Sequence, residues 1–480
     1  MKALAGAFTD RALEGFRSLG LAPGSPGGRR RVLMLASFVA AALWLFPSTA
    51  RPLLRDRNPR AIAQRFQAAV SFDNDIAAIA DSASKANLRD AARWFFTGDW
   101  LDARGAGPRW RPLASCFWWL EYQAFKTDLA LYNVVTLLMV AICCCLLAGA
   151  VAALSRSVLV GAAAAGFFLW KVAGELGAIL VWFPAQIDVL AGAWLAASLY
   201  LLAVGVEAAG RRRSALIGCS LACYVAAVLS KEAALFFPIV AWAALWFRLR
   251  PVPGHPERPV RVAEGRRGGL CWMAAYGLAA LLLLAARTSI LGGAGPFLVR
   301  LDPAYLLARA VYVLFGVRFA HGTEWPALGG AILAAALFFA ANWPHLARRR
   351  LVAYGMVLAV PALLAMAAKF TMGSPYVLTE GVVWKQIAAP CLLLFSGALV
   401  FRWRRADGIV FACLILAASV QLVLVPDWQR VHYYYLPAMA WAAMDAAALA
   451  AAWDCLRAST AGSHPDSGGT SSEGGICARW

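Results

Sequence analysis

Residues 129–152 read LALYNVVTLLMVAICCCLLAGAVA, a stretch of 24 residues without a charged side chain. A run of this length and composition predicts a helix that crosses the hydrocarbon core of a bilayer, which is about 30 Å thick. Similar segments recur, so the sequence predicts an all-α polytopic membrane protein with about twelve transmembrane helices. The predicted helices cover residues 32–49, 129–152, 158–181, 186–208, 214–230, 233–248, 269–290, 326–343, 351–368, 386–402, 408–425 and 434–455. Segment 303–320 contains Arg309 and Arg318, which is more typical of a re-entrant or interfacial helix.

The overall composition indicates the same class. Hydrophobic side chains make up 61% of the 480 residues and charged ones only 15%, whereas soluble domains have about 45–50% and about 25%. These values exclude a soluble enzyme, a disordered protein and a disulfide scaffold. The net charge of +19 comes from basic residues that interrupt the apolar runs and form no single basic face, so no nucleic-acid partner is expected.

The distribution of Lys and Arg predicts the orientation of the chain. Residues 1–31 are polar and end in three arginines directly before the first apolar run. With the N-terminus in the cytoplasm, most basic residues of the short loops fall on the cytoplasmic side, as the positive-inside rule requires. We therefore expect an integral protein of the plasma (inner) membrane with both termini in the cytoplasm. It comprises a cytoplasmic segment 1–31, a transmembrane domain 32–455 and a disordered, Ser- and Gly-rich tail 456–480.

A long loop, residues 50–128, separates the first two predicted membrane helices and is expected outside the cytoplasm. Two short helices are predicted within it, the second beginning after Asp75. Their apolar faces would consist of Ile62, Phe66, Ala69 and Val70, and of Ile76, Ile79, Ala83 and Ala86. Such faces are compatible with packing on the lipid surface, or with the folded platform that enzymes acting on lipid head groups need there.

Acidic residues in this loop are candidates for base catalysis. Asp73 and Asp75 follow the first predicted helix, where a carboxylate could take the proton of an acceptor hydroxyl. The alternative is that Asp75 only caps the helix that follows. Asp99 is a further candidate, with a turn residue as the alternative.

Several cationic residues are candidates for phosphate binding. Arg111 precedes Pro112 at the membrane interface, where its forked donors could bind a phosphate or extend to lipid head groups. Lys231 and Glu232 lie between two apolar runs, so this pair either faces a polar cavity or lies at an external turn. Later outer loops contribute Lys385, Arg430 and His432, and charges within apolar segments include Lys171, Glu175, Asp188 and Arg287.

The order of these motifs resembles the GT-C superfamily of lipid-dependent glycosyltransferases, in particular its protein O-mannosyltransferase-like branch. The likeness covers residues 60–440 and rests on Asn74-Asp75-Ile76-Ala77-Ala78-Ile79, Asp99-Trp100, Trp110-Arg111-Pro112-Leu113, Leu229-Ser230-Lys231-Glu232 and Arg430 through Pro437. The family often has an Asp-Asp pair where this chain has Asn74 and Asp75, with Asp73 one residue earlier. This departure leaves open which carboxylate is catalytic.

The resemblance implies that the donor is a polyprenyl-phosphate-linked sugar and that the acceptor is a hydroxyl of a glycan, a lipid or a protein. Asp75, or else Asp73, would be the catalytic base. Arg111 and Arg430 would hold the donor phosphate, and the other substrate-binding residues would be Asp99, Lys231, Glu232, Lys385 and His432. The sequence itself requires no cofactor, and because some relatives use a divalent metal, a metal requirement stays open.

Two other functions are compatible with the helix number. A transporter or flippase of lipid-linked saccharides would explain the charges within apolar segments, but it predicts an internal pseudo-symmetry that the sequence does not show. An O-antigen ligase or polymerase would also act on polyprenyl-linked glycans. Its major external loop is expected late in the chain, whereas here the acidic loop comes first.

The orientation can be measured by thiol labelling in intact cells. The loops expected outside the cytoplasm are 50–128, 291–325, 369–385 and 426–433. Cysteines introduced at Ser82 and Ser374 should therefore react with a membrane-impermeant reagent. Labelling only from the cytoplasmic side would overturn this orientation and the catalytic role of the first loop.

Overall fold

The computed structural model describes residues 26–54, 58–72, 74–97, 110–173, 177–180, 182–248, 259–291, 405–424 and 435–461, and these form helices and turns without a strand. In this part of the chain, five helices are long and apolar enough to cross a membrane: residues 28–47, 129–155, 186–207, 210–230 and 268–291. Shorter apolar helices cover 158–173, 232–246 and 408–420. The all-helical class is thus confirmed. The count of about twelve spans stays a prediction, because segments 303–320, 326–343, 351–368 and 386–402 lie outside the described residues.

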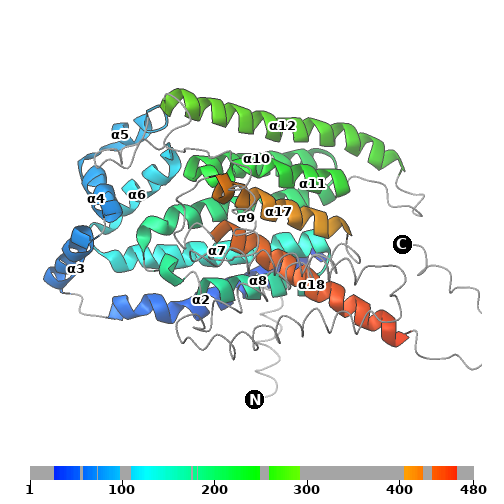
Figure 1. Ribbon diagram of the computed structural model, residues 1–480, viewed down its shortest axis with the longest axis horizontal. Coiled ribbons are helices and arrows are strands. Elements are labelled where there is room, and N and C mark those ends of the chain that lie inside the picture. Colours follow the sequence, from blue (N-terminus) through cyan, green and yellow to red (C-terminus); the bar gives the residue numbers. More distant parts are fainter. Residues whose placement is uncertain are drawn as a thin grey trace, which may run out of the picture.

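The long helices lie lengthwise beside one another and form an elongated bundle (Figure 1). The α-helices are α2 (Pro26–Leu54), α3 (Pro59–Phe72), α4 (Asn74–Lys85), α5 (Leu88–Arg93), α6 (Pro112–Phe125), α7 (Leu129–Ser155), α8 (Val158–Ala173), α9 (Gln186–Glu207), α10 (Gly210–Ser230), α11 (Pro238–Arg248), α12 (Pro259–Leu291), α17 (Arg405–Leu424) and α18 (Tyr435–Ala461). Short 3-10 helices are η2 (Gly177–Leu180), η3 (Phe183–Ala185) and η4 (Glu232–Phe236).

Helix α7 lies at the centre of the bundle and packs against α2, α8 and α9. Small residues permit this close approach, as is usual where apolar helices associate without a hydrophobic driving force from water. A Cβ atom on Gly149 would lie 2.6 Å from the sulfur of Met34 in α2. A Cβ atom on Gly161 of α8 would lie 2.5 Å from the carbonyl oxygen of Ala148 in α7. The helix backbones are therefore as close as their glycines allow.

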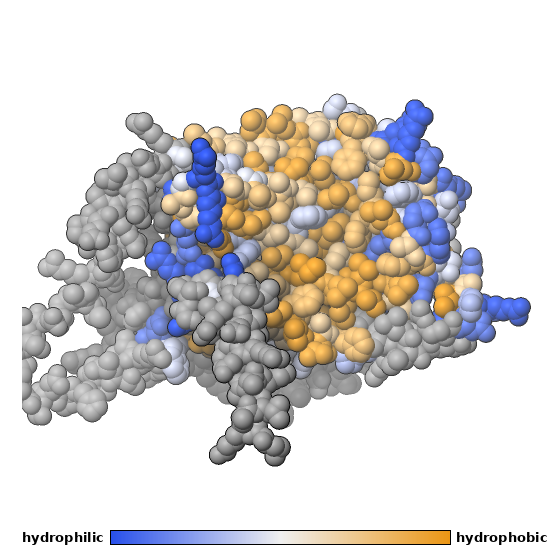
Figure 2. All heavy atoms as spheres, turned by 180° about the vertical axis from the view of Figure 1, so that it is seen from behind, coloured by the Kyte–Doolittle hydropathy of each residue, from blue (hydrophilic) through white to orange (hydrophobic). Residues whose placement is uncertain are grey.

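The outer surface of the bundle is apolar over a broad area between two more polar ends (Figure 2). Helix α12 runs along one edge and exposes large side chains, including Leu278, Leu281 and Leu282, which are 58–65% exposed. Apolar patches of this extent are rare on soluble monomers. A lipid bilayer is the environment that such a surface fits.

Four shorter helices, α3 to α6, gather at one end of the bundle (Figure 1). Three residues of the predicted α4 stripe, Ile76, Ile79 and Ala83, are buried, whereas Ala86 lies beyond the end of the helix and is only partly buried. The buried face is also wider than predicted, because it includes Ala77, Ala78 and Ala80. Ile76 and Ile79 form a separate apolar cluster with Trp118 of α6 and Ile187 of α9. The stripe therefore packs on protein. Helix α4 also begins at Asn74, before the predicted start after Asp75.

Several predicted boundaries are wrong, among them the start of α12, which begins at Pro259 and not at residue 269. Helix α2 already begins at Pro26, since proline is well suited to the first position of a helix, so Arg29 to Arg31 are helical. Helix α18 extends to Ala461, into the predicted tail. The predicted helix 158–181 ends at Ala173, and 3-10 turns follow it. Gly177 and Pro184 in this stretch both disfavour a continuous α-helix.

The contact between α7 and α8 generates a stability prediction. Gly161→Ala would place a methyl group against the backbone of α7 and should lower the stability by about 1–3 kcal/mol, as overpacking does. Gly166→Ala in the same helix is the matched control, because its added Cβ would meet nothing within 4 Å. This control should be neutral or slightly stabilising, since alanine favours helix. Equal thermal unfolding of the two variants in detergent would contradict the close α7–α8 contact.

Candidate active site

A buried ion pair joins α6 to the turn between α10 and α11. Arg111, the residue before α6, donates from Nε to Oε2 of Glu232 at 2.8 Å and from Nη2 to Oε1 at 2.5 Å. Both side chains are buried, and Arg287 of α12 adds a third charge, with its Nη1 3.7 Å from Oε2 of Glu232. Two parallel hydrogen bonds of this kind are the strongest geometry that arginine and a carboxylate can form.

A second buried ion pair adjoins the first, because Lys231 precedes Glu232 in the chain. The Nζ atom of Lys231 donates to Oδ1 of Asp188, and these side chains are only 1% and 2% exposed. Asp188 lies in the first turn of α9, where the helix dipole favours a negative charge. Its Oδ2 atom has no hydrogen-bond partner among the described residues.

The backbone explains why Lys231 and Glu232 are adjacent but bind different helices. Helix α10 ends at Ser230, and Lys231 has an extended backbone conformation, with φ −157° and ψ 132°. The chain then enters η4, whose first residue is Glu232. This change of direction lets Lys231 extend to α9 while Glu232 faces Arg111. The five side chains Arg111, Asp188, Lys231, Glu232 and Arg287, which we call the charge cluster, carry three positive and two negative charges.

Burying five charged side chains together costs desolvation free energy and contributes little net stability, which indicates that the cluster has a function. Removing ions from water costs several kcal/mol for each ion, and apolar replacements are often equally stable. Charged groups gathered within an apolar helix bundle are therefore candidates for a functional site. Within the ranges that the structure describes, no group of three or more His, Cys, Asp or Glu side chains could hold a metal ion.

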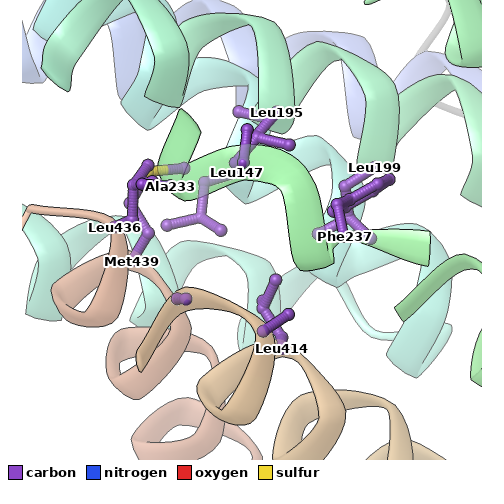
Figure 3. Close-up of a pocket in the computed structure, with 12 residues that line it drawn as sticks. Leu147, Leu195, Leu199, Ala233, Phe237, Leu414, Leu436 and Met439 are labelled. Carbon is purple, nitrogen blue, oxygen red and sulfur yellow. The ribbon is translucent and has the colours of Figure 1, made fainter. Parts of the chain in front are cut away.

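Helix η4 continues from Glu232 of the charge cluster into the wall of an apolar pocket (Figure 3). The pocket is small, with a volume of about 30 Å³, and is partly open to the outside. Ala233 and Ala234, the two residues after Glu232, form part of its wall. The other lining residues come from α7, α9, α17, α18 and the residue before α11: Leu147, Leu195, Ala196, Leu199, Phe237, Leu414, Ala417, Ala418, Leu436 and Met439.

The structure brings together three of the residues predicted to bind substrate. Lys231 and Glu232 lie at the turn between α10 and η4, where both side chains are buried and ion-paired. The alternative that Arg111 extends to lipid head groups is wrong, because its side chain is 6% exposed and bound to Glu232. The Nε and Nη2 donors expected to hold a phosphate bind this carboxylate.

Of the remaining predicted site residues, only Asp75 lies in a helix that the structure describes. Asp75 is the second residue of α4, in the helix that packs on α6 beside the charge cluster. The residues Asp73, Asp99, Lys385, Arg430 and His432 lie outside the described residues.

Two members of the charge cluster, Asp188 and Arg287, were expected only as charges within apolar segments. Their spacing gives no sign of their partners, since Asp188 is 43 residues from Lys231 in the chain. The one local signal is the position of Asp188 just after Pro184 and at the beginning of an apolar run. A carboxylate there is expected near the first turn of a helix.

No protein family, curated protein or solved structure matches the chain.

The energetic coupling of Lys231 and Asp188 can be measured by a double-mutant cycle. Lys231→Met leaves Asp188 buried without its cation and should lower the stability by about 3–5 kcal/mol. Adding Asp188→Asn should restore a large part of this loss. Lys85→Met, which breaks the exposed Asp81–Lys85 pair of α4, is the control and should cost about 0.3–0.5 kcal/mol. Additive effects of the two buried substitutions would show that the pair is not coupled.

Proposed function

We propose that the chain is a membrane glycosyltransferase that moves a sugar from a polyprenyl-phosphate donor to an acceptor hydroxyl. The observation that carries this proposal is that η4 begins with Glu232 of the charge cluster and continues with Ala233 and Ala234 of the apolar pocket. A donor of this class has the same two parts, an anionic phosphate and a long apolar chain, in direct succession. The resemblance to the GT-C superfamily supports the same donor.

The charge cluster offers three cationic side chains for the phosphate: Arg111, Lys231 and Arg287. Each of them already contacts a carboxylate, so the phosphate would share these cations with Asp188 and Glu232. Cations next to the leaving group stabilise the charge that develops on it in the transition state. The pocket beside η4 would take the first part of the polyprenyl chain.

Asp75 is the proposed base, with Asp73 as the alternative, on the strength of the sequence motif. The carboxylate would remove the proton of the acceptor hydroxyl while the hydroxyl oxygen forms a bond to the anomeric carbon of the sugar. The bond between this carbon and the phosphate oxygen breaks, and polyprenyl phosphate leaves with the electron pair. Because the phosphate leaves without protonation, the reaction needs one base and no separate acid.

The active site would lie on the outer side of the plasma (inner) membrane. Helices α3 to α6 would face away from the cytoplasm, so the donor would enter from the outer leaflet of the plasma (inner) membrane. The acceptor would be a glycan, a lipid or a protein on that side. This orientation follows from the basic residues at the opposite helix ends, such as Arg29 to Arg31 and Arg211 to Arg213.

A flippase for lipid-linked saccharides is the second candidate, and one observation favours it. Lys171 of α8 lies 3.9 Å from Asp445 of α18, and its ammonium group is 5.5 Å from the centre of the Trp441 ring. Ionisable pairs within membrane helices often mark a transport pathway. This pair is separate from the charge cluster.

Substitution of Asp75 separates the two functions. Asp75→Asn keeps the size of the side chain but removes its proton acceptor, so sugar transfer from a polyprenyl-phosphate sugar should fall about 10²–10⁴-fold in proteoliposomes. Donor binding and membrane insertion should stay normal. Asp81→Asn in the same helix removes an exposed carboxylate and serves as the matched control, with unchanged transfer.

Three outcomes would change this view. If Asp73→Asn is the inactive variant and Asp75→Asn is active, the base is Asp73, two residues earlier. Normal transfer by the double variant would refute carboxylate catalysis. Movement of the donor lipid between leaflets without any sugar transfer would favour the flippase.

A further inference from the structure

The first turn of α9 is held by a buried side chain, Gln186. Its Nε2 atom lies 2.8 Å from the carbonyl oxygen of Tyr132, 2.9 Å from the hydroxyl of Thr136 and 3.2 Å from Oε1 of Glu121. Ala185, the residue before the helix, makes no side-chain capping hydrogen bond. Gln186 therefore ties the start of α9 to α6 and α7, two residues before Asp188 of the charge cluster.

Glu121 of α6 is the unusual partner in this group of contacts. Its side chain is buried, with the residue 5% exposed, and accepts one hydrogen bond from Gln186. Its Oε2 atom and the Oε1 atom of Gln186 both have no hydrogen-bond partner among the described residues. Burial raises the pKa of Glu121 to about 8, and the hydrogen bond from Gln186 offsets only part of this effect. At neutral pH the carboxyl group therefore keeps its proton.

The surroundings of Glu121 contain ionisable groups, but the described ones leave its carboxyl without a cation. They include Arg111, Cys116, Tyr122 and Lys126 on or next to α6, Tyr132 of α7, Asp81 and Lys85 of α4, Arg89, Asp90 and Arg93 of α5, Asp188 of α9, Tyr224 of α10, and Lys231 directly after α10. Arg111, Lys85 and Lys231 pair with other carboxylates, and Lys126 donates to Gln123. The hydroxyl group of Tyr132 donates to the carbonyl oxygen of Lys126. An ionised Glu121 would thus have no ion pair within the described part of the chain.

We propose that Glu121 and Gln186 are positioning residues that hold Asp188 and Lys231 in place for the donor phosphate, and that Glu121 does so only as the neutral acid. This inference rests on the proposed function, because the phosphate site is the charge cluster. Helix α6 would thus have a pH-dependent role in the charge cluster, which also contains Arg111, the residue before this helix.

The physical reason is the cost of a buried charge. Loss of the proton would leave a carboxylate with one described hydrogen-bond donor in apolar surroundings, so the side chain would move towards water. Gln186 would lose its contact with α6, and the start of α9 would no longer be fixed on that side. A displaced Asp188 would weaken its ion pair with Lys231 and change the geometry of the cluster.

The pH dependence of donor use tests this proposal. Above pH 8 the neutral fraction of Glu121 falls about tenfold per pH unit, so wild-type protein should show a KM for the donor about tenfold higher at pH 9 than at pH 7, with less effect on kcat. Glu121→Gln keeps a neutral side chain of the same shape and should show nearly the wild-type KM at pH 7. Its KM should rise less than that of wild type, by the part that comes from Lys231, whose pKa burial lowers to about 8. Glu121→Ala should have a raised KM at both pH values. A parallel rise of KM in wild type and Glu121→Gln would overturn the proposal.

A second measurement does not depend on sugar transfer and separates this inference from the proposed function. The pKa of Glu121 is higher in the folded protein than in the unfolded chain, so the folded state holds the proton more tightly. Its contribution to stability is complete below about pH 4.5 and is lost as pH rises to about 8. The Tm of wild type relative to Glu121→Gln should therefore fall between pH 5 and pH 8. A constant difference would overturn the neutral acid even where no transfer is detected, and a falling difference would support it.

Discussion

The pairing of charges inside an apolar helix bundle is the constraint on which the arrangement of the site depends. Arg111, Lys231 and Arg287 come from different elements, yet each lies against a carboxylate because an unpaired ion there would cost several kcal/mol. The pairs therefore determine how the start of α6, the start of α9 and the turn after α10 meet. An apolar substitute could hold the same elements together. What it could not supply is a set of cations that a bound anion can share.

The pocket and the charge cluster have a common origin in the way α10 ends. A continuous helix through residues 231–237 would place successive side chains around one axis, whereas η4 is a tighter turn that follows an extended residue. Its charged beginning faces α6 and α9, and its alanines leave room between α7, α9, α17 and α18. Larger side chains at Ala233 and Ala234 would fill this room. One short element thus supplies both the polar and the apolar surface that a lipid phosphate requires.

The sequence predicted the class of the protein and most of the described helices, because hydrophobic length and composition are local properties of the chain. It also predicted the buried face of α4, since Ile76 and Ile79 recur at helical spacing. It singled out Arg111, Lys231 and Glu232, but not the way they pair. The partners Asp188 and Arg287 are distant in the chain, and no local pattern shows which charges share a buried volume. Glu121 could not be predicted for the same reason, because the burial that raises its pKa comes from helices that are distant in the chain.

A site in which every cation already has a carboxylate partner has a consequence for the proposed reaction. A phosphate that entered between free cations would bind tightly and leave slowly as the product, polyprenyl phosphate. In the charge cluster, the gain from each new contact is offset by weaker contact with Glu232 or Asp188, so substrate and product phosphates bind less tightly. The apolar pocket then contributes affinity that is the same for donor and product. Under this arrangement the difference in binding that drives catalysis must come from the phosphate, because its charge increases as its bond to the sugar breaks. The neighbouring cations are therefore most effective in the transition state, where the phosphate competes best with the two carboxylates.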